Sequence, residues 1–138
     1  MRRITILAVV SEKTSRIRLY YVEDSSELRS RIDRELAGID GVLLMGHSER
    51  ASEALREIRR YQPDVVVLDL QLSEGSGIDV LKGLRGEDRM PTVIVLTNHS
   101  DATTRSRTLK AGASYFFDKS TEFDQFLFTV NRLTQSSP

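Results

Sequence analysis

Short apolar runs alternate with amphipathic stretches along the chain from about residue 16 onward. The runs at 65–70 and 92–96 are rich in β-branched residues and read as apolar on both faces, which is typical of central strands in a parallel sheet covered by helices on both sides. The same reasoning predicts five strands, at residues 17–22, 42–45, 65–70, 92–96 and 114–117.

Helices are predicted between and after these strands, because apolar residues recur there every three or four positions. The second helix ends at Gln62-Pro63, since proline cannot continue it, and Ser120 or Thr121 is the expected N-cap of the fifth. The apolar positions are Leu28, Ile32, Leu36 and Ile39 in the first helix, Ala51, Ala54, Leu55 and Ile58 in the second, and Ile78, Leu81 and Leu84 in the third, and the fourth and fifth helices are predicted over 101–111 and 121–133. Five strand–helix units with right-handed crossovers predict an α/β fold, a doubly wound five-stranded parallel sheet in the flavodoxin-like order 2-1-3-4-5.

Residues 1–15 are predicted to form an N-terminal extension, and residues 16–138 a single domain. The extension reads Met-Arg-Arg, then a short apolar run, then a polar stretch at 11–15. A secretory signal peptide begins in this way, but the apolar run is at the short limit and no small-x-small cleavage site follows. An extra edge strand, an arm that packs on a neighbour and a disordered leader are the other interpretations, and all stay open.

Composition narrows the classes of partner. Lys plus Arg and Asp plus Glu both number 20, so the formal net charge is zero, whereas a dedicated nucleic-acid binder relies on surplus positive charge. Cysteine is absent, which excludes disulfides, thiolate zinc sites and thiol catalysis. No apolar run approaches the roughly 20 residues that span a bilayer. We therefore expect a cytoplasmic domain with no direct nucleic-acid or membrane partner.

Polar side chains lie at the ends of four predicted strands: Glu23 and Asp24 after the first, Asp69 at the end of the third, Thr97 after the fourth and Lys119 after the fifth. Ligands of such sheets bind beyond the carboxyl ends of the strands. Three carboxylates drawn together repel one another unless a cation enters, and oxygen ligands suit Mg²⁺. Asp69 could then act as a nucleophile toward a phosphoryl group, with Lys119 and Thr97 stabilising its oxygens. Each residue alone fits a turn, cap or loop; the joint pattern favours the site.

With these residues in order, the chain from about 16 to 133 resembles the receiver domains of bacterial two-component response regulators, and among them the single-domain, chemotaxis-regulator-like ones. The matching motifs are the acidic pair Glu23-Asp24, the phosphoacceptor strand 65–70 with Asp69 in it, Gly77 eight residues after Asp69, the switch hydroxyl of Thr97, and the segment 112–119, with Phe116 at the switch aromatic position and Lys119 at its end.

The resemblance implies a signalling switch rather than an enzyme, limited to self-catalysed phosphoryl uptake on Asp69 and autodephosphorylation. It implies Mg²⁺, or Mn²⁺ in its place, on Asp24, Asp69 and the backbone carbonyl of Gln71, with Glu23 acting mostly through water. A sensor histidine kinase or phosphotransfer protein would supply the phosphoryl group. Thr97 and Phe116 would switch the surface of the fourth helix, fifth strand and fifth helix toward a downstream protein target or a homodimer through those two helices.

The chain departs from the family pattern in several places. Ser73 and Ser120 stand where proline is usual, so the Lys119–Ser120 peptide is predicted to be trans. Asn98 replaces the usual small residue after the switch threonine, which predicts narrower access to the phosphoryl group. His99, like Gln71, occupies a position that tunes dephosphorylation in the family, but we interpret it as a surface residue, and the other histidine, at 47, as structural.

The fourth helix has weak helix formers and few predicted apolar anchors, Ala102, Leu109 and Ala111, so it is expected to shift most easily. On the fifth helix, Phe128 is predicted to point opposite the core-facing stripe and to contact a partner.

Three other functions fit parts of the sequence. A haloacid-dehalogenase-type phosphatase would need a second Asp two residues after its nucleophile, where this chain has Gln71. A receiver-like adaptor that works without phosphorylation would keep the fold but has no need of the full set of polar residues. The chain could also be the receiver part of a longer transcription factor.

Overall fold

The computed structural model describes residues 16–135. Within them, five parallel strands form one sheet in the order β2-β1-β3-β4-β5. The predicted strand order is therefore confirmed. The strands are β1 (Ile17–Val22), β2 (Val42–Ser48), β3 (Val65–Leu68), β4 (Thr92–Thr97) and β5 (Tyr115–Asp118). The predicted extension at 1–15 lies outside the described residues.

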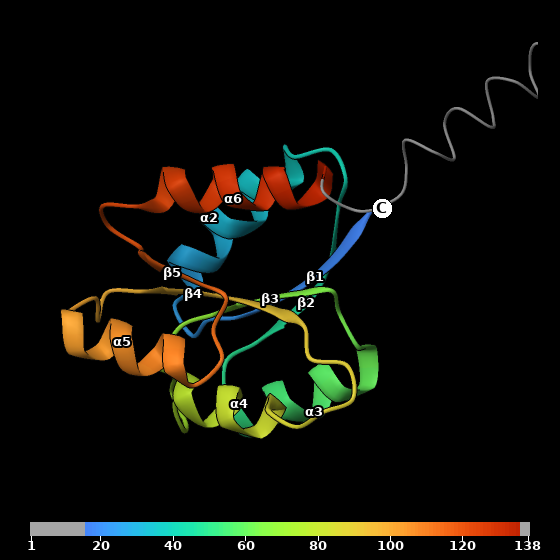
Figure 1. Ribbon diagram of the computed structural model, residues 1–138. Coiled ribbons are helices and arrows are strands. Elements are labelled where there is room, and N and C mark those ends of the chain that lie inside the picture. Colours follow the sequence, from blue (N-terminus) through green and yellow to red (C-terminus); the bar gives the residue numbers. More distant parts are fainter. Residues whose placement is uncertain (1–15, 136–138) are drawn as a thin grey trace, which may run out of the picture.

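Helices cover both faces of this sheet (Figure 1). They are α2 (Ser26–Ala37), α3 (Ala51–Tyr61), α4 (Gly77–Leu84), α5 (Ala102–Lys110) and α6 (Phe123–Gln135). The helices α2 and α6 lie on one face, and α3, α4 and α5 lie on the other. None of these helices combines the length and the apolar character that a membrane span needs.

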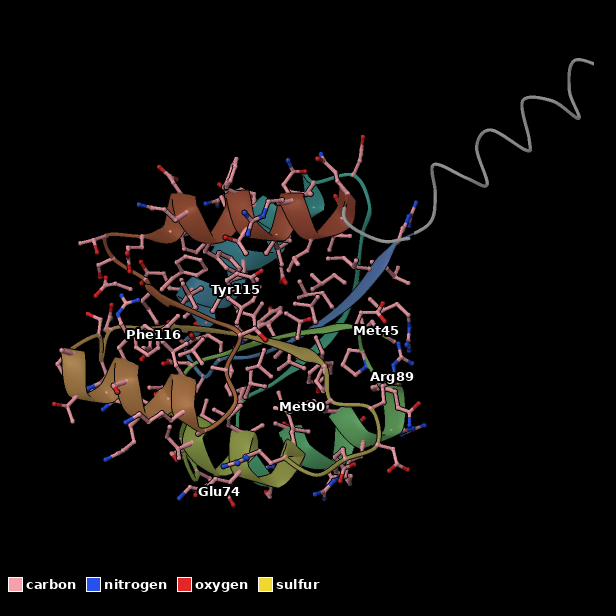
Figure 2. The ribbon with its side chains drawn as sticks, in the orientation of Figure 1. Met45, Glu74, Arg89, Met90, Tyr115 and Phe116 are labelled. Carbon is pink, nitrogen blue, oxygen red and sulfur yellow. The ribbon has the colours of Figure 1, made fainter. Side chains whose placement is uncertain are left out.

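Two apolar clusters follow from the alternation of side chains along the strands. Tyr21, Val67 and Ile94 pack against α2 and α6 in one cluster. Val66 and Val95 belong to the second cluster, on the face that α3 and α4 cover. On β5, Tyr115 and Phe116 likewise point to opposite faces (Figure 2). Every residue of β3 is buried, as expected of a central strand whose two faces are both covered.

Several predicted boundaries differ from the structure. The strand predicted over 65–70 ends at Leu68, so Asp69 begins the following loop. The strand predicted to end at residue 45 continues to Ser48, because it still pairs with β1 there. The cap prediction for the last helix was wrong: α6 begins at Phe123, since the backbone N–H groups of Ser120 and Thr121 donate to a preceding carboxylate and form a separate turn.

Of the three anchors predicted for α5, Ala111 packs against the apolar core as expected, but Ala102 and Leu109 were wrong. The one buried residue of α5 is Thr108, whereas Leu109 is 41% exposed and Ala102 is exposed. The Thr108 hydroxyl donates to the carbonyl of Thr104 at 2.7 Å, which satisfies it within the helix. The helix therefore turns a small polar side chain toward the sheet and its only leucine toward solvent.

Candidate functional site

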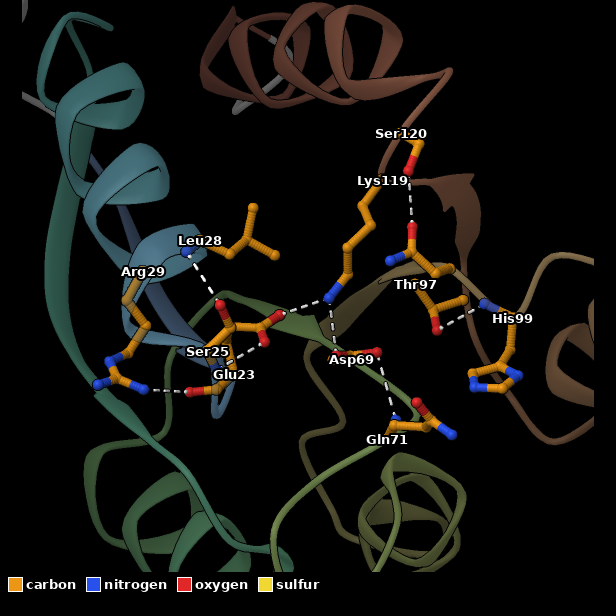
Figure 3. Close-up of polar contacts among 11 residues, drawn as sticks. Glu23, Ser25, Leu28, Arg29, Asp69, Gln71, Thr97, His99, Lys119 and Ser120 are labelled. Carbon is orange, nitrogen blue, oxygen red and sulfur yellow. Dashed lines mark hydrogen bonds and ion pairs between the residues drawn. The ribbon is translucent and has the colours of Figure 1, made fainter.

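Glu23, Asp69 and Lys119 each lie one residue beyond the end of a strand, and their side chains meet (Figure 3). One more backbone hydrogen bond holds each residue at the sheet edge: Asp69 N donates to Val22 O at 3.1 Å, Glu23 N to Ser48 O at 2.9 Å, and Lys119 N to the Thr97 carbonyl at 3.0 Å. These bonds continue the ladders of the sheet. Rigid strands therefore position all three side chains.

The ammonium of Lys119 bridges two carboxylates. Its Nζ atom lies 2.8 Å from Asp69 Oδ2 and 3.0 Å from Glu23 Oε1. All three side chains are largely shielded, with exposed fractions of 13% for Lys119, 3% for Glu23 and 6% for Asp69. Shielding from water strengthens such contacts, and it makes an uncompensated charge at this place costly.

Burial and neighbouring charges shift two ionisation equilibria here. Burial raises the pKa of Glu23; the backbone N–H of Ser25 lowers it, and the adjacent Asp69 raises it further. For Lys119, burial disfavours the ammonium, but its hydrogen bonds and attraction to Asp69 and Glu23 outweigh burial and raise its pKa. Lys119 therefore stays charged at neutral pH, where it can offset negative charge on an incoming anion.

Three carboxylates gather tightly enough to hold a metal ion. One oxygen each from Glu23, Asp24 and Asp69 lies within 4.8 Å of the others. Glu23 uses Oε1 for Lys119 and Oε2 to accept the N–H of Ser25 at 3.0 Å. Asp24 is only partly buried. A hard divalent cation that keeps several waters suits this oxygen-rich, partly open arrangement.

The loop after Asp69 is held close to the carboxylate. Gln71 N donates to Asp69 Oδ1 at 3.3 Å, and Gly77 N donates to Leu70 O at 3.0 Å. A Cβ atom at Gly77 would lie 2.2 Å from the carbonyl oxygen of Asp69. Only glycine therefore lets the start of α4 pass this close to Asp69. The role of the Gln71 carbonyl as a ligand stays a prediction.

The predicted switch residues lie on the two strands that follow. Thr97 ends β4, is fully buried, and accepts the N–H of His99 at 3.2 Å with its Oγ1. Its hydroxyl proton is therefore still available for donation. Phe116 on β5 is 4% exposed. His99 is exposed, and His47 stacks on Tyr21 with ring centroids 5.3 Å apart, as expected of a surface and a structural residue.

Sequence reasoning missed Arg105 on α5. Its guanidinium lies over the ring of Phe116, 4.7 Å from the centroid, and donates to the Phe116 carbonyl at 3.2 Å. It also contacts Glu122 at 3.3 Å. Arg105 thus connects α5 to β5 and to the start of α6. No sequence signal singled it out, because an arginine on a polar helix is usually a solvated charge.

Asp118, just before Lys119, was missed as well. Its carboxylate accepts the Ser100 hydroxyl at 2.5 Å and the backbone N–H groups of Ser120 and Thr121 at 2.8 and 2.9 Å. These bonds, above all that of Ser100, lower the pKa of Asp118 to about 2. An Asp whose carboxylate can accept the backbone N–H groups two and three residues further on favours such a local turn. The Lys119–Ser120 peptide is trans, as predicted.

A flavodoxin-like sheet with an acidic cluster and a lysine at its carboxyl edge defines the class of this domain. A family model of the response regulator receiver domain matches residues 19–131, and the chain belongs to this family of two-component signalling proteins.

Relatives agree with this assignment. The transcriptional regulatory protein KdpE of Mycobacterium tuberculosis is 47% identical over 74 residues, 54% of this chain and 32% of that protein. Protein-glutamate methylesterase/protein-glutamine glutaminase 2 of Burkholderia thailandensis is 36% identical over 98 residues, 69% of this chain and 28% of that protein. The chain thus spans about a third of these relatives. A LuxR-family two-component response regulator from Aurantimonas sp. SI85-9A1 superposes with a TM-score of 0.80 at 26% identity, covering 88% of this chain and 86% of that one.

Proposed function

We propose that this receiver domain accepts a phosphoryl group on Asp69 from a sensor histidine kinase or phosphotransfer protein and acts in the cytoplasm as a switch for a protein partner. The observation that carries the proposal is the bridging of Asp69 and Glu23 by the Lys119 ammonium at 2.8 and 3.0 Å. An Asp carboxylate beside a buried cation and a second acid is the arrangement that phosphoryl transfer requires.

In this transfer an Asp69 oxygen forms a bond to phosphorus while the bond from phosphorus to the donor breaks, and the donor leaves with the bonding electrons. Lys119 faces the new negative charge, and Thr97 can donate its free hydroxyl proton to a phosphoryl oxygen. Both groups extend from strand ends, so little reorganisation is needed.

Mg²⁺, or Mn²⁺ in its place, would be held by Asp24, Asp69 and the Gln71 carbonyl. Both Glu23 oxygens already have partners, which supports a role for Glu23 through water rather than as a direct ligand. When bound, the cation supplies charge neutralisation between the carboxylates and the phosphoryl oxygens.

Phosphoryl uptake tests this proposal. A labelled small acyl phosphate with Mg²⁺ should label the wild type, and Asp69→Ala or a chelator should abolish labelling. Asp88→Ala, which removes an exposed loop carboxylate, is the matched control and should label normally. Normal labelling of Asp69→Ala would contradict the assignment. A folded wild type that takes no label but still captures a partner would favour the phosphorylation-independent adaptor.

The output surface is proposed to be α5, β5 and α6, where phosphorylation would promote partner binding or a homodimer through the two helices. Phe128 on α6 is 67% exposed, and a large apolar side chain in that position suits a contact. Phe128→Asp should weaken association of the phosphorylated domain in sedimentation and partner pull-down. Tyr61→Asp on α3, which lies on the face of the sheet opposite α6 and outside the proposed surface, is the control. Equal association of Phe128→Asp and wild type would exclude this surface.

A further inference from the structure

The residues that directly follow Thr97 and Lys119 are joined by a side-chain hydrogen bond. Ser120 Oγ donates to Asn98 Oδ1 at 2.9 Å (Figure 3). Both residues depart from the pattern that the sequence otherwise resembles, since Asn98 replaces a small residue and Ser120 replaces proline. The usual pair cannot form this bond, because proline has no side-chain donor. The two departures thus create one contact.

This contact extends the pairing of β4 and β5 beyond the strands. Thr97 pairs with Asp118 in the sheet register, and Lys119 N donates to Thr97 O at 3.0 Å as the next backbone bond. The Asn98–Ser120 bond comes one residue further along each chain. The Ser120 backbone is itself held, since its N–H donates to the Asp118 carboxylate at 2.8 Å. The backbone that carries the donor hydroxyl is therefore held in place next to Asn98.

The bond lies beside the entrance to the site. A groove of about 590 Å³ runs from the start of α2, with Ser25 and Leu28, to Asn98 and Lys119. Asp69 is only 5% exposed and contacts Lys119 directly. The groove therefore ends one side chain away from the acceptor carboxylate, and Asn98 forms part of the wall at that end.

We propose that Asn98 and Ser120 are positioning residues that prolong the lifetime of the phosphoryl group on Asp69. Their hydrogen bond fixes the spacing of Thr97 and Lys119 and restricts the approach of water from the groove. This inference rests on the proposed function, because it requires the aspartyl phosphate. In the hydrolysis concerned, a water oxygen bonds to phosphorus, the bond from phosphorus to the Asp69 oxygen breaks, and the products are the Asp69 carboxylate and inorganic phosphate carrying the water's protons.

The test measures the decay of labelled protein after removal of a small acyl phosphate donor, with Mg²⁺ present throughout. Ser120→Ala and Asn98→Ala should each shorten the lifetime about 2- to 10-fold, the range expected for one net hydrogen bond. The double variant should decay no faster than either single variant, because both remove the same contact. Ser120→Thr keeps the hydroxyl and should retain the long lifetime. Ser106→Ala, at an exposed position of α5, is the matched control.

Four results would overturn the inference. Wild-type decay rates in both single variants, or shortenings that multiply in the double variant, would show that the bond does not control hydrolysis, while the labelling itself would leave the proposed function standing. A shortened lifetime that tracks a lowered melting temperature would assign the bond to general stability. A wild type that takes no label at all would overturn the proposed function and this inference together.

Discussion

The helices α4 and α5 have nearly equal lengths, 8 and 9 residues, and each follows a strand that leads into the site. Their anchoring differs sharply. The helix α4 buries Gly77, Val80, Leu81 and Leu84 and begins with a capping box, whereas α5 buries Thr108 alone. The helix that follows Asp69 is thus well packed, and the helix that follows Thr97 is not.

If Asp69 receives a phosphoryl group as proposed, this difference would suit separate mechanical roles for the two halves of the site. A phosphoacceptor must stay in place for the chemistry, and Asp69 is followed by the well-packed helix. An element that changes position must have two arrangements of similar free energy, which is easier for a helix with few buried contacts. The side-chain hydrogen bonds that hold α5 come from Arg105, which donates to the Phe116 carbonyl and to Glu122. In the loop before the helix, the Ser100 hydroxyl donates to Asp118.

The largest expected effect is that of Gly77→Ala. Its Cβ would overlap the Asp69 carbonyl oxygen at 2.2 Å and Leu70 Cα at 2.9 Å, and backbone atoms cannot move aside cheaply. We expect a loss of unfolding free energy of about 3 kcal/mol or more, or failure to fold, measured by urea denaturation. Gly38→Ala is the matched control, because its Cβ would lie 3.5 Å from Glu35 O in ordinary contact. Equal stability of the two variants would mean that α4 does not approach Asp69 so closely.

The same substitution in both helices tests the difference in anchoring directly. Leu81 on α4 is fully buried, and Leu109 on α5 is 41% exposed. Leu81→Ala should lower the unfolding free energy by about 2–5 kcal/mol, the usual range for a buried leucine, and Leu109→Ala by less than about 1 kcal/mol. Urea midpoints at one pH provide the measurement. A Leu109→Ala variant as unstable as Leu81→Ala would remove the contrast.

Much of the fold could be predicted because hydrophobic periodicity survives in each element. The run 65–70 indicated a buried central strand, and β3 is buried throughout. Which residues of α5 face the sheet could not be predicted in this way. The expected anchors were Ala102, Leu109 and Ala111, yet the buried residue inside the helix is Thr108, and its hydrogen bond to the Thr104 carbonyl makes that burial possible. A sparse apolar pattern leaves the orientation to tertiary contacts.

The residues of the site likewise divide into those that the sequence predicted and those that it did not. Glu23, Asp69 and Lys119 meet as expected, because strand ends fix where they lie. Arg105 and Asp118 escaped notice because their roles depend on neighbours distant in sequence, such as Phe116 for Arg105 and Ser100 for Asp118. Spacing along one chain carries no signal for such pairs.

The smallest expected effect concerns the loop before α5, where the Asp118 carboxylate accepts the Ser100 hydroxyl. It tests whether polar contacts hold this weakly packed half of the site. Hydrogen bonds keep the pKa of Asp118 near 2, below its ordinary value of 3.8, so folding favours the carboxylate. Its stabilisation is therefore complete above about pH 4 and is lost as the pH falls toward 2. Asp118→Asn should be slightly less stable than wild type at pH 6 and at pH 5, and the gap should narrow by pH 3, measured as urea midpoints. Ser100→Ala removes the strongest of these bonds, so its own gap to wild type should close over the same pH range. A gap for Asp118→Asn that stays constant from pH 6 to pH 3 would show that the Asp118 carboxylate does not tie this loop.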